Sequence, residues 1–149
     1  MNQYDNANKI MTERFGRDCL ISIATVEGTH PHVRTVDGYY DDGAFYVINY
    51  TLSNKMKQIA AQPEVAVCGE WFNGHGIGEN LGYVRDESNA AIMARLREAF
   101  AAWYGNGHVN EDDPNTCLLC IRLTDGVLFD HARKYGKGRF IIDFANRTA

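Results

Sequence analysis

The chain has 149 residues, 45% of them hydrophobic and 23% charged, with a formal net charge of −4 and a pI near 5.7. This composition allows a buried core and excludes a disordered tail, and the acidic balance argues against a nucleic-acid partner, which usually requires a basic face. No apolar run reaches the roughly 20 residues of a membrane helix, and residues 1–12 lack the apolar centre of a signal peptide, so we expect one cytoplasmic domain over residues 1–149 with no membrane partner.

The first third of the chain predicts a helix followed by closely spaced strands. The predicted elements, in chain order, are a helix at residues 3–15 and strands at 18–26, 32–40 and 44–49. Glu27-Gly28 and Asp41-Asp42-Gly43 are turn signals between these strands. Because turns this short leave no room for a helical crossover, the sheet is predicted to be largely antiparallel.

The pattern becomes helical at residues 53–61, with Met56, Ile59 and Ala60 on one face, and Pro63 ends the helix. Later strands are predicted at 64–72, around Tyr83, and at 117–124, 127–131 and 139–144. Between them Asp86 is predicted to cap a long helix whose apolar stripe should serve packing: Ile92, Met93, Leu96, Phe100 and Trp103. Six or seven antiparallel strands with flanking helices predict a mainly β fold, closed into a barrel that removes exposed edges.

The strongest local chemistry lies where the third strand ends and the 53–61 helix begins. Ser53 is the predicted N-cap, and the first turn of a helix carries unpaired N–H groups and partial positive charge that suit a phosphate. Thr51 and Ser53 add hydroxyl donors, and Lys55 adds a full charge. The alternative interpretation is that Ser53 only caps a surface helix and that Lys55 is a solvated charge.

Four short segments carry a resemblance to a known family. They are residues 31–36 (PHVRTV), 42–47 (DGAFYV), 53–59 (SNKMKQI) and 62–67 (QPEVAV). In this order the sequence resembles the pyridoxamine 5'-phosphate oxidase-like family, the flavin mononucleotide (FMN)-binding split barrels, over about residues 15–144. Within that family it looks most like the small general-stress-protein branch.

The resemblance implies a homodimer with two FMN molecules between its subunits. The cofactor-binding residues that it implies are Arg34, Thr35, Val36, Asn49, Tyr50, Ser53, Asn54 and Lys55. The first three would lie along the flavin ring and ribityl chain, the next two at the ring edge, and the last three at the phosphate. FMN carries the hydride or electron chemistry itself, so the expected function is an FMN-dependent oxidoreductase with a small-molecule electron donor or acceptor of unknown identity.

The sequence departs from the oxidases of this family at several positions. Asn54 stands where they carry an arginine, Gly38-Tyr39-Tyr40 replaces a lysine, and Lys137-Gly138-Arg139 is a weak substitute for their C-terminal tryptophan and arginine motif. We therefore do not expect oxidation of pyridoxamine phosphate, and no residue stands out as catalytic. The alternatives are a non-enzymatic flavin-binding or stress-response module, and a barrel that binds haem or a deazaflavin; a haem would need an axial ligand such as His75 or His131.

Two further motifs have plainer interpretations. Residues 74–82 are rich in glycine, but Leu81 stands where a dinucleotide fingerprint needs its third glycine, so a bent connection with close backbone approach is predicted. In small members of the family this stretch comes near the flavin from the partner subunit, which adds Trp71, His75 and Asn80 to the expected site. Cys117 and Cys120 form a CxxC, but a strand points positions i and i+3 to opposite faces, so reduced structural cysteines and no metal site are expected.

Overall fold

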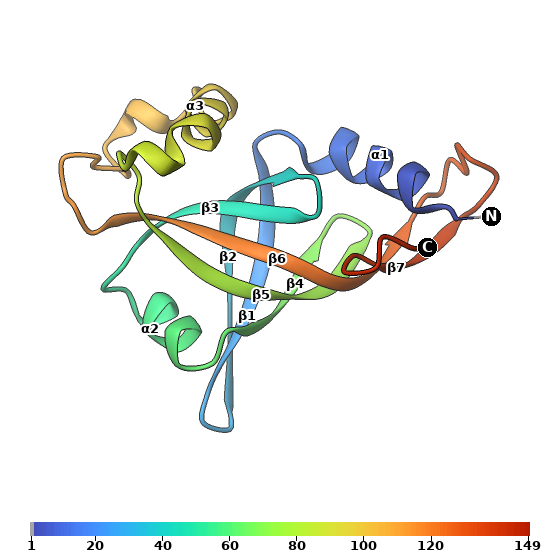
Figure 1. Ribbon diagram of the computed structural model, residues 1–149, viewed down its shortest axis with the longest axis horizontal. Helices are drawn as coiled ribbons and strands as arrows, with labels where there is room; N and C mark the ends of the chain where they lie inside the picture. Colours follow the sequence, from blue (N-terminus) through green and yellow to red (C-terminus); the bar gives the residue numbers. More distant parts are fainter. Residues whose placement is uncertain (1) are drawn as a thin grey trace.

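Short turns between apolar strands close an antiparallel barrel in the computed structural model, which describes residues 2–149 (Figure 1). The strands are β1 (Cys19–Glu27), β2 (His30–Asp41), β3 (Ala44–Tyr50), β4 (Glu64–Gly69), β5 (Phe72–Tyr83), β6 (Thr116–Phe129) and β7 (Arg139–Asp143). Their order is β3-β2-β1-β4-β5-β6-β7, and β3 also pairs with β6. Six strands therefore form a closed ring and β7 extends from β6, which confirms the predicted fold class.

Three helices flank the barrel: α1 (Tyr4–Phe15), α2 (Asn54–Ala61) and α3 (Ala90–Ala99), with short 3-10 turns η1 (Glu87–Asn89) and η2 (Tyr104–Asn106). Figure 1 shows α1 beside β7 and both chain ends, whereas α3 lies at the opposite end of the long β5–β6 ribbon. Helix α2 connects β3 to β4. None of the helices within residues 2–149 is long and apolar enough to cross a membrane.

Two apolar clusters hold these elements together. In the barrel, the Phe45 ring lies 5.6 Å from that of Phe15 and 6.3 Å from that of Phe72, measured between ring centroids. A second cluster packs Met93 and Leu96 of α3, together with buried Phe100, against Leu118 of β6. Strand β6 therefore contributes to both clusters, which is possible because successive side chains point to opposite faces of a strand. The predicted packing role of the apolar helix stripe is confirmed.

The structure corrects the prediction for residues 64–82. The predicted strand 64–72 ends at Gly69, and β5 then runs as one long strand through the glycine-rich segment, which is not a bent connection. The predicted close approach is confirmed, because a Cβ atom at Gly74 would lie 2.4 Å from the Asp125 carbonyl oxygen and one at Gly78 would lie 2.7 Å from Cγ2 of Ile59. The glycines therefore let β5 pass close to β6 and α2 without leaving the sheet.

The structure also differs from the predicted boundaries of the later strands and of the helix after Asp86. The predicted strands 117–124 and 127–131 are one strand, β6, because Gly126 makes room for the Phe72 ring and does not form a turn; a Cβ atom there would lie 2.6 Å from that ring. Asp86 caps η1, accepting a hydrogen bond from the Ser88 N–H at 3.0 Å, and α3 ends at Ala99. Trp103 thus lies beyond the helix.

Candidate functional site

The start of α2 is built as the sequence predicts. Ser53 has extended backbone angles (φ −69°, ψ 155°), and its Oγ accepts a hydrogen bond from the Met56 N–H at 3.3 Å, which confirms the N-cap. The hydroxyl hydrogen of Ser53 remains a donor after this bond is made. The first turn of α2 contains no acidic residue, so its positive end is not neutralised by its own helix.

Two positive side chains lie close together beside this helix end. Lys55 is half-buried, and its pKa is lowered to about 8, first by burial and then by the positive charge of Arg34. Burial also lowers the pKa of Arg34. Within residues 2–149, neither side chain has a carboxylate within ion-pair distance. Two uncompensated cations at a helix N-terminus form a site for an anion.

Arg34 is fixed in position by neutral groups of β1 and α2. It lies opposite Ile23 in the β1–β2 pair, and its Nη1 donates to the Ile23 carbonyl at 3.2 Å and to the Thr25 hydroxyl at 2.8 Å. Its Nη2 donates to Oε1 of Gln58 at 3.1 Å. These three neutral acceptors fix the orientation of the guanidinium without neutralising its positive charge. Sequence reasoning missed Thr25 and Gln58, because only the fold brings them to Arg34.

The wall beside Lys55 is completed by β5 and β6. Asn80 Nδ2 donates to the Thr51 hydroxyl at 3.3 Å, and both residues come from the same chain. The buried Cys117 thiol lies next to both Thr51 and Lys55; burial raises its pKa, and those two neighbours partly oppose the rise. The sequence-predicted Thr51, Ser53, Lys55 and Asn80 thus gather on one side of the barrel, and with Arg34 they form what we call the anion cradle.

The residues expected at the flavin ring line neighbouring hollows. Asn49 and Tyr50 border one of about 270 Å³, and Val36 borders another of about 210 Å³; Ile48 and His108 border both. The Asn49 Oδ1 accepts from the Tyr50 N–H at 2.9 Å, but its Nδ2 is buried without a hydrogen-bond partner. A buried unpaired donor is costly, so this atom is suited to an acceptor on a bound molecule.

Thr35 and Asn54, the other two expected residues of the β2 and α2 segments, are both exposed. Thr35 pairs with Ser22 across the β1–β2 ladder, and its Oγ1 lies 3.4 Å from the Ser22 Oγ. Thr35 therefore lies on the opposite face of β2 from Arg34, because the two are adjacent on a strand. A molecule bound at the cradle within one chain would be reached by Arg34 and not by the Thr35 side chain.

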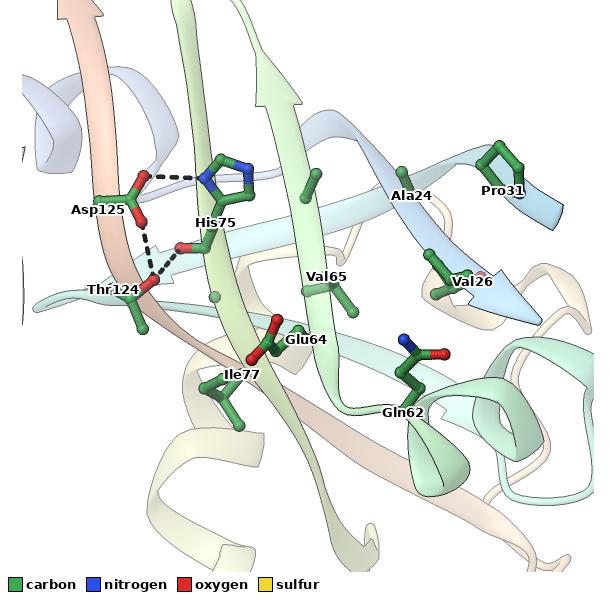
Figure 2. A pocket seen from close by; sticks show the side chains of 13 residues that line it. Ala24, Val26, Pro31, Gln62, Glu64, Val65, His75, Ile77, Thr124 and Asp125 are labelled. Atoms are coloured by element: carbon green, nitrogen blue, oxygen red, sulfur yellow. Dashed lines mark hydrogen bonds and ion pairs between the residues drawn. The ribbon is translucent and has the colours of Figure 1, made fainter. Parts of the chain in front are cut away.

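Trp71 and His75 lie apart from the cradle. His75 borders a hollow of about 470 Å³ on the outer side of β1, β4 and β5, and its Nδ1 lies 2.9 Å from the Asp125 carboxylate (Figure 2). Trp71 stands at the β4–β5 turn, where its ring centroid is 4.3 Å from that of His131. A single chain therefore does not bring these two residues to the other site residues.

Beside that hollow, β1, β2 and β4 carry a group of mostly small side chains, which we call the small-residue face. Ala24 of β1 pairs with Ala66 of β4 and with Val33 of β2, and Ser22 pairs with Cys68. Directly opposed residues share one face of a sheet, and here that face is the outer one, with Val33 72% exposed.

All four cysteines are free thiols, and residues 2–149 contain no cluster of three or more metal-ligating side chains.

Comparisons with known proteins place this geometry in context. Residues 11–128 match the family model described as pyridoxamine 5'-phosphate oxidase. No curated protein matches the sequence significantly. Among solved structures, General Stress Protein 26 from Bacillus anthracis has a TM-score of 0.62 at 18% identity, covering 81% of this chain and 92% of that one.

Two further structures share the fold. A FAD-binding protein from Mesorhizobium loti has a TM-score of 0.57 at 15% identity, covering 79% of this chain and 90% of that one. A heme-binding protein from Mycobacterium smegmatis has a TM-score of 0.63 at 14% identity, covering 88% of this chain and 55% of that one. At these identities the structures show the fold alone.

Proposed function

Because the chain belongs to the pyridoxamine 5'-phosphate oxidase family, we propose that it binds FMN and acts as a flavin-dependent oxidoreductase. The observation that carries this proposal is the uncompensated pair of Arg34 and Lys55 at the start of α2. Because Arg34 lies beside Lys55, we assign it to the phosphate and not to the flavin ring and ribityl chain, where the resemblance put it. A phosphomonoester carries close to two negative charges at neutral pH, which matches two cations and a helix N-terminus. The Ser53 and Thr51 hydroxyls add neutral donors.

The ring of the flavin would lie over the hollows bordered by Val36, Asn49 and Tyr50. The unpaired Nδ2 of Asn49 supports this assignment, because a flavin ring presents carbonyl acceptors at its edge. Asn54 is exposed at the first helical position and would add a neutral contact to the phosphate. When bound, FMN supplies the hydride or electron transfer, and the chain supplies binding, orientation and exclusion of water.

The active form in this proposal is a homodimer. The small-residue face of β1, β2 and β4 would pack against the same face of a second copy, because it points outward and includes the exposed apolar side chain of Val33. His75 and Trp71 would then approach the flavin of the partner subunit, with Thr35 on the same outer side. The Asp125 carboxylate would hold the His75 ring in one orientation.

The first test identifies the small molecule released by denaturing freshly purified protein, using mass spectrometry and an absorption spectrum. FMN is the expected product. Release of FAD or a deazaflavin, or a strong Soret band from haem, would contradict the cofactor assignment. Anaerobic mixing with reduced nicotinamide cofactors then tests the reaction: rapid flavin reduction supports an oxidoreductase, whereas only slow reduction by every donor tried would favour the non-enzymatic module.

The second test addresses the cradle. The double variant Ser53→Ala/Lys55→Ala is expected to lose at least about tenfold in FMN affinity, because it removes one hydroxyl donor and one full charge. Lys57→Ala is the matched control, since Lys57 is an exposed lysine on the same helix. Undiminished FMN affinity in a folded double variant would remove the phosphate assignment.

A further inference from the structure

Gln58 is a buried polar side chain beside the cradle that makes three side-chain hydrogen bonds. It lies on the inner side of α2 and is 7% exposed. Its Oε1 accepts from the Thr25 hydroxyl at 2.5 Å and from Arg34 Nη2 at 3.1 Å, while its Nε2 donates to Glu27 Oε2 at 3.1 Å. The donors and the carboxylate on its two sides fix which end of the amide faces which neighbour.

The amide of Gln58 stands between a carboxylate and a guanidinium. The Glu27 carboxylate is held on the Nε2 side and Arg34 on the Oε1 side, and Glu27 and Arg34 form no ion pair. An arginine that binds a carboxylate directly does so with charge-assisted bonds that compete with a phosphate for the same donors. A neutral amide sets the direction of the guanidinium and leaves its charge available.

The count of donors on Arg34 supports the same conclusion. Its hydrogen bonds to Ile23, Thr25 and Gln58 use three of the five N–H groups of a guanidinium. The Nε–H and one Nη2–H have no partner within residues 2–149. These two neighbouring donors match the two oxygens of a bidentate phosphate contact.

From these contacts we propose that Gln58 is a positioning residue that makes the cradle select a phosphomonoester over the same ligand without phosphate. It acts through Arg34: it holds the guanidinium with two donors free and keeps it apart from Glu27. Thr25, which is fully buried and bonded to both Gln58 and Arg34, takes part in the same arrangement. This inference rests on the proposed FMN site and names how that site recognises the phosphate.

The test compares FMN with riboflavin, which has the same ring but no phosphate, by titration of the flavin-free protein. Gln58→Glu is expected to weaken FMN binding at least about tenfold, because the new carboxylate pairs with Arg34, and to leave riboflavin binding within about twofold. Gln58→Met removes the amide at similar length, and a several-fold loss confined to FMN is expected. Gln62→Met is the matched control, an exposed glutamine at the end of the same helix.

The possible results distinguish the proposed phosphate site from the proposed role of Gln58. Equal affinity of the wild-type chain for FMN and riboflavin would overturn the proposed phosphate site itself. A wild-type preference for FMN that survives in folded Gln58→Glu and Gln58→Met would overturn only the role of Gln58, and so would an equal loss of both ligands, which indicates a purely structural role. If the Gln58 variants do not fold, Thr25→Val tests the same arrangement: a loss of affinity confined to FMN supports it, and an unchanged ratio of the two affinities overturns it.

Discussion

At the scale of single residues, Lys55 shows the cost of burying a cation beside another one. The side chain is half-buried, and its pKa is about 8 because burial and Arg34 both disfavour the charged form. In the unfolded chain the lysine pKa returns to its ordinary value, so between that value and pH 8 the folded state holds fewer protons. The free energy of unfolding therefore rises with pH across this window, and at neutral pH the folded chain carries the full penalty of the buried charge.

The same pKa predicts how flavin binding depends on pH. At the proposed site only the charged form of Lys55 would attract the FMN phosphate, which is already doubly ionised above about pH 6. Between pH 7 and pH 9 the affinity for FMN should fall about tenfold as Lys55 loses its proton, whereas that for riboflavin should stay nearly constant.

Fluorescence titration at several pH values measures this dependence. Lys55→Met should bind FMN weakly and with little change over the same range. A wild-type affinity for FMN that does not change between pH 7 and pH 9 would contradict the assignment of Lys55 to the phosphate.

The sequence allowed some of these residues to be predicted and hid others. Ser53 and Lys55 could be identified because a capped helix start is a local signal within a few residues. Gln58 and Thr25 could not, because their contacts with Arg34 join three separate elements, and a buried glutamine on a helix has no local signature. Asn49 was predicted, but its unpaired amide is visible only once its neighbours are placed.

At the scale of elements, the strand order could be predicted because turn signals and short connections specify antiparallel pairs. Most of strand β5 was wrongly predicted as a bent connection, because glycine lowers strand propensity. The sequence does not reveal that a neighbouring residue occupies the space that a side chain at a glycine position would fill. Gly78 is such a position: the space that a side chain would fill is occupied by Ile59 of α2. The glycine therefore sets how closely α2, and with it the anion cradle, approaches the barrel.

Gly78→Ala should consequently destabilise the chain and disturb the cradle. The added Cβ would lie 2.7 Å from Ile59 Cγ2, so the Ile59 side chain, with α2 that carries it, or β5 has to move. Overpacking of this kind costs about 1–3 kcal/mol of unfolding free energy. Chemical denaturation measures the loss, and FMN affinity should fall with it.

Gly105→Ala is the matched control, because a Cβ atom at Gly105 meets nothing within 4 Å and its backbone requires no left-handed conformation. A Gly78→Ala chain as stable as this control, with wild-type FMN affinity, would show that the close contact between β5 and α2 does not position the cradle.

At the scale of the whole molecule, the small-residue face of β1, β2 and β4 borders a hollow, whose lining Figure 2 shows. Closure of the six-strand ring could be predicted from the need to remove sheet edges. The position of the small-residue face could not, because Ala24 and Ala66 come from strands far apart in the sequence and only their register places them together.

Ala66→Arg should convert the proposed homodimer to a monomer, because it places a long charged side chain at the centre of the small-residue face. Analytical ultracentrifugation or light scattering after size exclusion measures the change in mass. FMN occupancy should fall in the same variant, since His75 and Trp71 of the partner subunit would leave the site.

Ile141→Arg is the control on β7, where Ile141 is already 64% exposed. A wild-type chain that is monomeric at working concentration would contradict the dimer. An Ala66→Arg variant that remains dimeric would instead place the interface on another face.

The pairing of β3 with β6 has a consequence for the order in which the chain folds. It joins residues 44–50 to residues 116–122, and Asn49 and Tyr50 stand opposite Cys117 and Thr116 at its end. Contacts between segments so distant in sequence form late, because a long loop must close first. The local hairpins can form before this seam, whereas the wall of the cradle beside Lys55 exists only after it closes. Refolding followed by flavin fluorescence should therefore show binding competence as the last step to recover. The proposed cofactor would then bind only completed barrels and would not guide their assembly.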